Sequence, residues 1–384
     1  MRSSPSDASQ PLRGVRILDF TRVLAGPYGT MHLADLGADV VKVEHPSGGD
    51  DTRSYGPPFQ DGISTYFLSI NRGKRSVALD LKQPEARATA RALALKADVV
   101  FENFRPGVME RLGLDAETLR AVKPSLICCT IRAFANANDP RPGYDLMIQG
   151  LSGIPSITGP VDGEPYKCGA SIADMTSGMH AVQAICAALF HRERTGEGAS
   201  IVIPLMDSQR SLLTYHASAW LNGGSPSQRR GNHHPSIHPF CVLPTADGHI
   251  CLCIGNDKLW RAFCVVAGAP ALGDDPRFVT NRLRVANRAA LDAWLEPTVA
   301  ARTLDDWLHS LAAAGVPAGP MRSVEEALED AELVAHPHPV SGTPVRTLPV
   351  PILIDGERPT TARAPSLLGA DTAAVCAEWL KNRD

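Results

Sequence analysis

Short apolar runs alternate with amphipathic stretches through the first third of the chain. Apolar runs at 15–20 and 37–44 flank a stretch at 28–36 whose apolar residues have helical spacing. This order predicts a strand–helix–strand unit with parallel strands. The same patterning predicts a helix at 85–97 and further strands at 76–81, 98–101, 126–131 and 200–204. The alternation as a whole predicts an open α/β domain.

The amino-acid composition of the sequence changes after residue 222. A stretch rich in Gly, Pro and Ser at 223–232 indicates a linker and a domain boundary. Beyond it, two apolar runs separated by a polar turn at 246–249 predict a β-hairpin. Helical patterns follow at 259–266, 286–300 and 304–314, and a last helix is predicted at 372–381. The middle of the chain therefore predicts a smaller α+β unit.

Composition excludes several classes of partner. Hydrophobic residues make up 44% of the 384 residues and charged residues 21%, as in ordinary globular proteins. The net charge of -3 offers no basic field for nucleic acid, and no apolar run has the length of a membrane span. The nine cysteines are scattered without a pairing pattern, which indicates reduced thiols and a cytoplasmic location. No Gly-x-Gly-x-x-Gly fingerprint follows the first strand, so NAD and FAD are not indicated.

A lone carboxylate, Asp174, follows the small-residue stretch Gly169-Ala-Ser-Ile-Ala173 and precedes a helical pattern that runs to Arg192. An Asp at a helix start commonly caps it, because its oxygens accept hydrogen bonds from the free N–H groups there. Small residues beside a carboxylate also suit a site that a bulky substrate approaches. Local sequence leaves both interpretations open, with the helix cap the more frequent one.

Clustered cations mark candidate anion sites. The segment Asn71-Arg-Gly-Lys-Arg75 carries three cations and is either a solvated basic turn or a contact for a polyanionic cofactor. Among the arginines we rank Arg72, Arg75 and Arg132 highest as binders of an anionic substrate.

The segment 230–239, at the end of the Gly/Pro/Ser-rich stretch, carries three histidines, His233, His234 and His238. No Cys or carboxylate accompanies them in the sequence, so we expect no metal site. Asn232 and His233 are instead candidates for a lid or substrate loop.

Several short motifs occur in an order that is similar to one known family. They are Pro11-Leu-Arg-Gly-Val-Arg-Ile-Leu-Asp-Phe20, Leu24-Ala-Gly-Pro27, Gly37-Ala-Asp-Val-Val-Lys-Val-Glu44, Asn71-Arg-Gly-Lys-Arg-Ser76, Glu102-Asn-Phe-Arg-Pro-Gly107, Ala173-Asp-Met-Thr-Ser-Gly178, Arg194-Thr-Gly-Glu-Gly198, Gly315-Val-Pro-Ala-Gly-Pro320 and Arg363-Ala-Pro-Ser-Leu-Leu-Gly369. Each motif is weak alone, but the ordered set, from Pro11 to Thr372, resembles the family III CoA-transferases, which include formyl-CoA transferase.

The resemblance implies a Rossmann-like large α/β domain built from both chain ends and a smaller α+β domain. The expected division is 1–222 for the N-terminal part of the large domain, 223–333 for the small domain and 334–384 for the return. It also implies an interlocked homodimer and a covalently acylated Asp, which Asp174 matches.

The resemblance further implies coenzyme A or acyl-CoA as a substrate, with no tightly bound cofactor. Carried over by motif, the CoA contacts are Leu24, Ala25, His45, Leu79, Lys82, Asn103, Phe104, Arg105, Arg111, Arg141, Tyr144 and Asp145. His45 departs from the family, which often has Arg at this position, and a neutral imidazole would bind a phosphate less well.

The implied chemistry suits a carboxylate nucleophile. Asp174 would attack a thioester to give a mixed anhydride, CoA would return to give an aspartyl-CoA thioester, and an incoming acid would take the CoA through a second anhydride. Each oxyanion needs donors, for which we expect backbone N–H groups near 176–178 or a mobile glycine loop.

The segments 50–53, 55–59, 64–66 and 143–145 resemble a subgroup that moves CoA between succinyl-CoA and a second dicarboxylate, such as glutarate, hydroxymethylglutarate or itaconate. The main alternative is an α-methylacyl-CoA racemase, which is similar in fold and has Gly-His-Asp where this chain has Gly143-Tyr-Asp145. A phenol with a pKa near 10 is a poor proton carrier, which favours transfer. A non-catalytic CoA-binding protein would have no need of Asp174.

Overall fold

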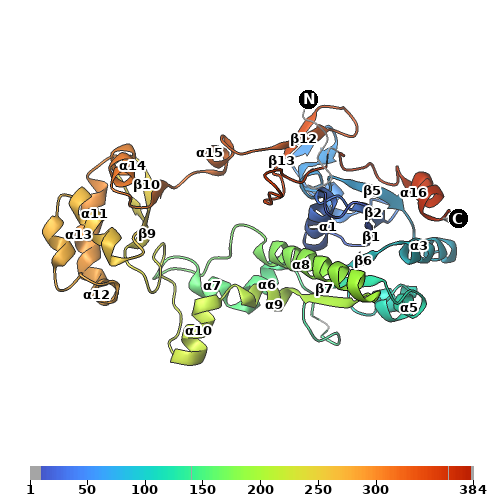
Figure 1. The fold of residues 1–384 in the computed structure, drawn as a ribbon, viewed down its shortest axis with the longest axis horizontal. Helices are drawn as coiled ribbons and strands as arrows, with labels where there is room; N and C mark the ends of the chain where they lie inside the picture. Colours follow the sequence, from blue (N-terminus) through green and yellow to red (C-terminus); the bar gives the residue numbers. More distant parts are fainter. Residues whose placement is uncertain (1–9, 140, 362, 382–384) are drawn as a thin grey trace. The chain divides into compact units, whose positions relative to one another are not determined.

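The computed structural model describes residues 10–139, 141–361 and 363–381 (Figure 1). The chain divides into two compact units. The large unit comprises residues 1–154, 167–218 and 332–384, and the small unit comprises 155–166 and 219–331.

A six-stranded parallel sheet forms the centre of the large unit, which confirms the predicted α/β fold. From one edge to the other the strands are β5 (Lys74–Ala78), β2 (Asp39–Glu44), β1 (Arg16–Asp19), β6 (Val99–Glu102), β7 (Ile127–Arg132) and β8 (Ser200–Pro204). The chain builds outward from β1 through β2 and β5, then returns to the other side of β1 with β6. The strand order therefore reverses between β1 and β6, where sheets of this kind open a crevice at their carboxyl ends.

Helices cover both faces of the sheet, because successive residues of each strand point to opposite faces. Ile17 of β1 packs in a core with α1 (Ala25–Asp35) and α8 (Ile172–Thr195). Its neighbour Leu18 packs in a second core with α3 (Pro84–Lys96), α5 (Ala116–Val122) and α16 (Thr372–Trp379). The C-terminal helix thus completes the layer that α3 begins, as Figure 1 shows.

Two glycines let α1 and α8 approach closely. A Cβ atom on Gly178 would lie 2.5 Å from the carbonyl oxygen of Ala25, and one on Gly29 would lie 3.0 Å from the carbonyl oxygen of Gly178. Any larger residue at 178 would push the helices apart. The contact places the first turn of α8, which carries Asp174, beside the start of α1.

The remaining elements of the large unit and its boundaries are short. They are η2 (Asp51–Ser54), β3 (Phe59–Gln60), β4 (Ile63–Ser64), α2 (Thr65–Ile70), α4 (Val108–Leu112), α6 (Asp145–Ser152), α7 (Ile154–Ile157), α9 (Leu205–Ser211), α10 (Thr214–Gly223), β12 (Val334–Pro337) and β13 (Pro344–Thr347).

A three-stranded antiparallel sheet and a group of helices form the small unit. The strands are β11 (Ala318–Pro320), β10 (His249–Cys253) and β9 (Phe240–Pro244), and β9 and β10 form the predicted hairpin. Its core stacks Phe263 on Trp307 with ring centroids 5.9 Å apart. The helices are α11 (Asp257–Val266), η3 (Pro270–Asp274), α12 (Asn281–Ala286), α13 (Arg288–Ala300), α14 (Leu304–Ala313) and α15 (Val324–Leu328). The sequence pattern did not predict α12.

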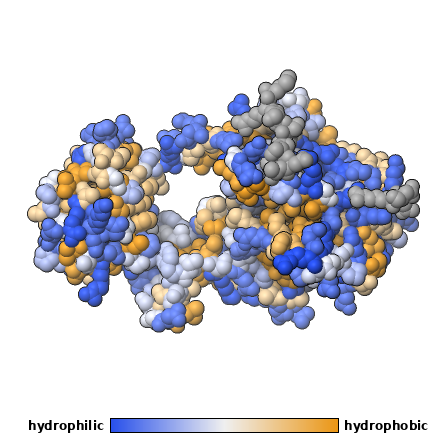
Figure 2. Space-filling model, in the orientation of Figure 1, coloured by the Kyte–Doolittle hydropathy of each residue, from blue (hydrophilic) through white to orange (hydrophobic). Residues whose placement is uncertain are grey.

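The surface mixes hydrophilic and hydrophobic side chains on the visible face of each unit (Figure 2). Across the described ranges, every helix is too short or too polar to cross a membrane.

Candidate active site

The carboxyl ends of β1, β6, β7 and β8 surround a pocket of about 280 Å³ in the large unit, here called pocket A. The strands are parallel, so the segments that follow them meet at one edge of the sheet. Asp174 lies in the lining together with eight of the other residues that the sequence singled out. The full lining comprises Arg22, Val23, Leu24, Ala25, Asp51, Asn103, Phe104, Arg105, Pro106, Ile131, Arg132, Ala133, Arg141, Pro142, Gly143, Tyr144, Asp174 and Leu205.

Asp174 is not the cap of its helix, which corrects the more frequent local interpretation. Ser171 precedes the first helical residue, and no side chain of α8 itself caps the helix. The capping oxygen comes from Asp145, whose Oδ1 accepts hydrogen bonds from the N–H groups of Ala173 at 2.9 Å and Asp174 at 3.4 Å. The carboxylate of Asp174 is therefore left available for chemistry.

The electrostatic surroundings of Asp174 disfavour its charged form. Burial, together with repulsion from the charge of Asp145, raises the pKa of Asp174 from 3.8 to about 7. Within the described residues, its carboxylate makes no hydrogen bond or ion pair. Burial and the negative charges nearby, that of Asp174 foremost, raise the pKa of Tyr66 to about 12. A desolvated carboxylate in a pocket, with no cation paired to it, is a candidate nucleophile.

Asp145 holds the start of the helix that carries Asp174. Its second oxygen, Oδ2, accepts a hydrogen bond from Gln149 Nε2 at 2.7 Å, and Gln149 Oε1 in turn accepts from the N–H of Cys168 at 2.8 Å. Both carboxylate oxygens of Asp145 are thus engaged inside the protein, and the residue is absent from the lining of pocket A. The resemblance placed Asp145 among the CoA contacts, and its role as a helix cap left no local signal because the capped helix is a different one.

The expected oxyanion donors at 176–178 are also not available. These residues lie inside α8, where backbone N–H groups bond to the carbonyl four residues earlier. The pattern is already in place at Met175, whose N–H donates to the carbonyl oxygen of Ser171 at 3.0 Å.

Asn103, which follows β6, holds the loop that follows β1 at the place where the strand order reverses. Its Oδ1 accepts from the N–H of Arg22 at 2.8 Å, and its Nδ2 donates to the carbonyl oxygen of Arg22 at 2.8 Å. The Arg22 guanidinium reaches into the site and pairs with Asp51 at 2.8 Å. Arg22 is not among the arginines ranked from the sequence. Its position just after a buried strand was the signal that could have identified it.

Buried charges hold the turn that follows β1. Lys42 donates to the carbonyl oxygen of Thr21 at 2.6 Å and pairs with Asp50 at 2.8 Å, while Asp19 accepts the N–H of Thr21 at 2.8 Å. Val23, in the same turn, has a φ of +67°, which is strained for a β-branched residue. The network fixes this strained turn against pocket A.

Four arginines line pocket A, of which Arg22 is paired with Asp51. Arg141 is paired with Asp139 at 2.6 Å. Arg132 donates from Nη2 to the carbonyl oxygen of Ala135 at 2.6 Å, and its Nε is buried without a hydrogen-bond partner. Arg105 is exposed at the pocket and makes no ion pair within the described residues. Arg105 and Arg132 are therefore the cations free to bind an anionic ligand here.

A second pocket of about 240 Å³, pocket B, lies over the carboxyl ends of β2 and β5. The predicted CoA contacts His45, Leu79 and Lys82 line it, together with Leu112. Arg22 and Phe104 line both pockets, so an extended ligand could occupy the two at once. His45 Nε2 lies 3.5 Å from Asp80, whose negative charge makes the imidazole a poor contact for an anion. The apolar leucines and Phe104 suit a flat base, and Lys82 suits a phosphate.

Other predicted residues lie elsewhere. Arg72 is buried and pairs with Asp35 at 2.5 Å, and Arg75 pairs with Asp39 and with Glu378. These two arginines line neither pocket, and the acidic residues paired with them neutralise their charge. Three further residues that line neither pocket are Arg111, exposed on α4, and Asn232 and His233, both in the small unit.

Comparison with known proteins gives a consistent result. Residues 12–372 match the model of CoA-transferase family III. A succinate–glutarate CoA-transferase from Agrobacterium fabrum is 41% identical, with 96% of this chain and 95% of that protein covered. A succinyl-CoA:glutarate CoA-transferase from Mus musculus is 38% identical, with 98% and 88% covered. The crystal structure of a CAIB/BAIF family protein from Brucella suis is 40% identical and has a TM-score of 0.84, with 97% of this chain and all of that chain covered.

The ordered motifs, the parallel sheet and the free carboxylate in pocket A agree with these matches along almost the whole chain. The chain belongs to CoA-transferase family III.

Proposed function

We propose that this CoA-transferase moves CoA from succinyl-CoA to a second dicarboxylate, with glutarate the first candidate acceptor, and that Asp174 carries the groups in transit. The observation that carries the proposal is the unpaired carboxylate of Asp174 in a pocket with free arginines. The names of the two relatives above, both acting on succinate or succinyl-CoA and glutarate, support the choice of acids.

The chemistry proceeds without loss of the thioester energy. The ionised carboxylate of Asp174 attacks the succinyl thioester carbonyl, forming an aspartyl–succinyl anhydride and expelling CoA thiolate. The thiolate attacks the aspartyl carbonyl and releases succinate, which leaves an aspartyl-CoA thioester. Glutarate attacks that carbonyl, and the thiolate it displaces attacks the glutaryl carbonyl of the new anhydride. Glutaryl-CoA leaves and the carboxylate of Asp174 is regenerated.

Burial of Asp174 serves this sequence. Ionised and poorly solvated, the carboxylate is a stronger nucleophile than one in water, and Asp145 raises its energy further.

A dicarboxylate keeps one carboxylate ionised while the other reacts, and this distal group needs a cation. Of the three arginines ranked from the sequence, only Arg132 lines pocket A. Its buried Nε has no hydrogen-bond partner, which leaves a donor for a ligand oxygen. We assign Arg132 to the distal carboxylate and the exposed Arg105 to a phosphate or carboxylate at the pocket mouth.

The decisive experiment incubates the purified protein with succinyl-CoA in deuterated water and identifies the CoA esters by mass spectrometry. Separate samples contain glutarate, itaconate, or a 2-methylacyl-CoA without succinyl-CoA. We expect glutaryl-CoA without deuterium. Deuterium at the α-carbon of the 2-methyl ester, without acyl exchange, would instead establish racemase chemistry at Asp174 and Tyr144. No exchange in any sample would refute the choice of acids.

A second measurement tests the covalent step. After succinyl-CoA is added without acceptor, the peptide that contains Asp174 should gain the mass of CoA less one water. The variant Asp174→Asn should show no such adduct, and Asp207→Asn, which changes an exposed first-turn carboxylate on α9, should retain it. An adduct on another residue would contradict the assignment.

The proposal includes a homodimer in the cytoplasm. Large apolar side chains that lie exposed on the single chain support the dimer, among them Phe190, Trp220, Leu221 and Leu353. The nine free cysteines support a reducing compartment. Size-exclusion chromatography with light scattering tests the dimer, and a monomer mass would refute it.

A further inference from the structure

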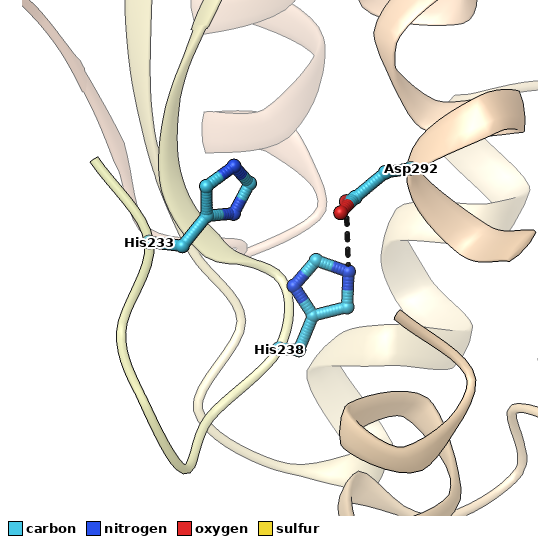
Figure 3. Close-up of side chains that lie close together, drawn as sticks. All are labelled: His233, His238 and Asp292. Atoms are coloured by element: carbon cyan, nitrogen blue, oxygen red, sulfur yellow. Dashed lines mark ion pairs between the residues drawn. The ribbon is translucent and has the colours of Figure 1, made fainter. Parts of the chain in front are cut away.

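A second group of side chains that could bind a ligand lies in the small unit. His233 and His238 lie on the segment before β9, and Asp292 lies on α13. Each offers one ligand atom, and the three atoms all lie within 4.8 Å of one another. Figure 3 shows the two imidazoles and the carboxylate turned toward a common centre. His238 Nε2 is 3.0 Å from Asp292 Oδ1.

Unsatisfied polar atoms gather at this point. His238 is fully buried, and neither of its ring nitrogens has a hydrogen bond of acceptable geometry. The same holds for His233 Nδ1, Asp292 Oδ1 and Arg288 Nη1, all of which are buried. Proteins rarely leave buried polar atoms without partners, and such a cluster calls for a bound ion or water.

The backbone around the cluster is held from the helices behind it. Asn281 Oδ1 accepts the N–H of His238 at 3.1 Å, and Arg284 Nε donates to the carbonyl oxygen of His238 at 2.8 Å. Arg288 Nη2 donates to the carbonyl oxygen of His234 at 2.8 Å. These contacts fix the backbone of the histidine segment against α12 and α13 before any ligand binds.

The donor set selects the ligand. We propose that His233, His238 and Asp292 form a binding site for a divalent transition-metal ion of the zinc class. Two imidazoles and one carboxylate suit Zn²⁺ or Co²⁺ and are too rich in nitrogen for Ca²⁺ or Mg²⁺. Four-coordinate Zn²⁺ with bonds of 2.0–2.2 Å holds its ligand atoms roughly 3.3 Å apart. Side-chain movements of about 1 Å bring the three ligand atoms to that separation.

Charge around the site shapes what else binds. Arg288 and Arg230 are the cations that face it, and Asp292 and Glu296 are the carboxylates. These four charges balance, so the metal ion adds positive charge that its protein ligands do not neutralise. Three protein ligands also leave a coordination position open. Water, hydroxide or a small anion fills that position, which distinguishes the site from a closed structural zinc site.

Cobalt(II) titration of the full-length, tag-free, chelator-treated protein tests the proposal. We expect one equivalent of Co²⁺ to bind, with the intense visible absorption of a low-coordinate site, and Zn²⁺ to displace it. Asp292→Asn, which is nearly isosteric, and His233→Ala should each weaken binding at least about tenfold. His309→Ala removes an exposed histidine on α14 in the same unit and should leave binding unchanged.

Circular dichroism of each variant confirms that it is folded. If the wild-type protein binds no stoichiometric Co²⁺, the three side chains form only an ion pair and the proposal is overturned. Binding that persists unchanged in Asp292→Asn and His233→Ala would place the metal elsewhere and overturn it equally.

Discussion

Replacing Asp174 with Asn should make the protein inactive and more stable, and the gain in stability should grow with pH. The pKa of Asp174 rises from 3.8 in the unfolded chain to about 7 in the folded protein, because burial and Asp145 disfavour the charge. Between these values the folded state binds more protons than the unfolded state, so stability falls as pH rises through this window. Asn carries no charge in either state and escapes this loss.

The magnitude follows from the two pKa values. Integrating the linkage relation gives a gain for Asp174→Asn of up to about 4 kcal/mol at pH 8 and about 2 kcal/mol at pH 5. With roughly 2–4 °C per kcal/mol for a domain of this size class, the melting temperature of the variant should exceed that of the wild type by about 8 °C or more at pH 8.

The assay is thermal unfolding of ligand-free protein at pH 5 and pH 8. Asp207→Asn is the matched control, because Asp207 is also a first-turn carboxylate but is exposed. It should lose about 0.3–1 kcal/mol at both pH values through its weaker interaction with the helix dipole. If Asp174→Asn is no more stable than the wild type at pH 8, or gains equally at both pH values, then Asp174 is not the desolvated carboxylate described here.

Further predictions address the same site. The pH dependence of kcat/KM reports the pKa values of the free enzyme, so kcat/KM should fall below about pH 7, because Asp174 must be ionised to attack. A flat profile down to pH 5 would contradict this. Asp145→Asn keeps a capping oxygen but removes a negative charge, so that limb should move to lower pH, and an unmoved limb would remove Asp145 as a cause. Arg132→Met should raise KM for the dicarboxylate acceptor about 10–100-fold through loss of a charged hydrogen bond, with a smaller effect on a monocarboxylate; equal effects on both acids would refute the assignment. Gly178→Ala should destabilise the protein by about 1–3 kcal/mol, because its Cβ would lie 2.5 Å from the carbonyl oxygen of Ala25, whereas Gly223→Ala, which meets no atom, should be nearly neutral in urea unfolding.

Local pattern determined the layered architecture. Apolar runs of strand length alternating with amphipathic helices indicated a parallel sheet, and parallel strands require crossovers of that kind. Both faces of such a sheet are buried, so its strands are almost uniformly apolar and easy to recognise. The position of Asp174 at the start of a helix was equally visible in the sequence, as were the segments after the strands that line pocket A.

The partners of charged side chains were decided only by the tertiary structure. Arg72 and Arg75 occur in a basic cluster that suggested anion binding, but Asp35 and Asp39 neutralise them across the fold. Conversely, Arg22 was not among the ranked arginines, yet it lines pocket A because Asn103 holds its loop there. Whether a charged side chain is free to bind a ligand depends on the charged and polar groups within a few ångströms of it. Residues far apart in the chain supply those groups.

The two carboxylates that matter most show the same division. The sequence placed Asp174 on a helix start, but only the packing of α6 against α8 brought Asp145 to cap that helix and leave Asp174 unpaired. In the small unit, the histidines appeared to lack a carboxylate until α13 brought Asp292 to them. Periodicity along the chain reports which face of an element is buried. It carries no information on which side chains meet across elements, and those meetings set the chemistry of both sites.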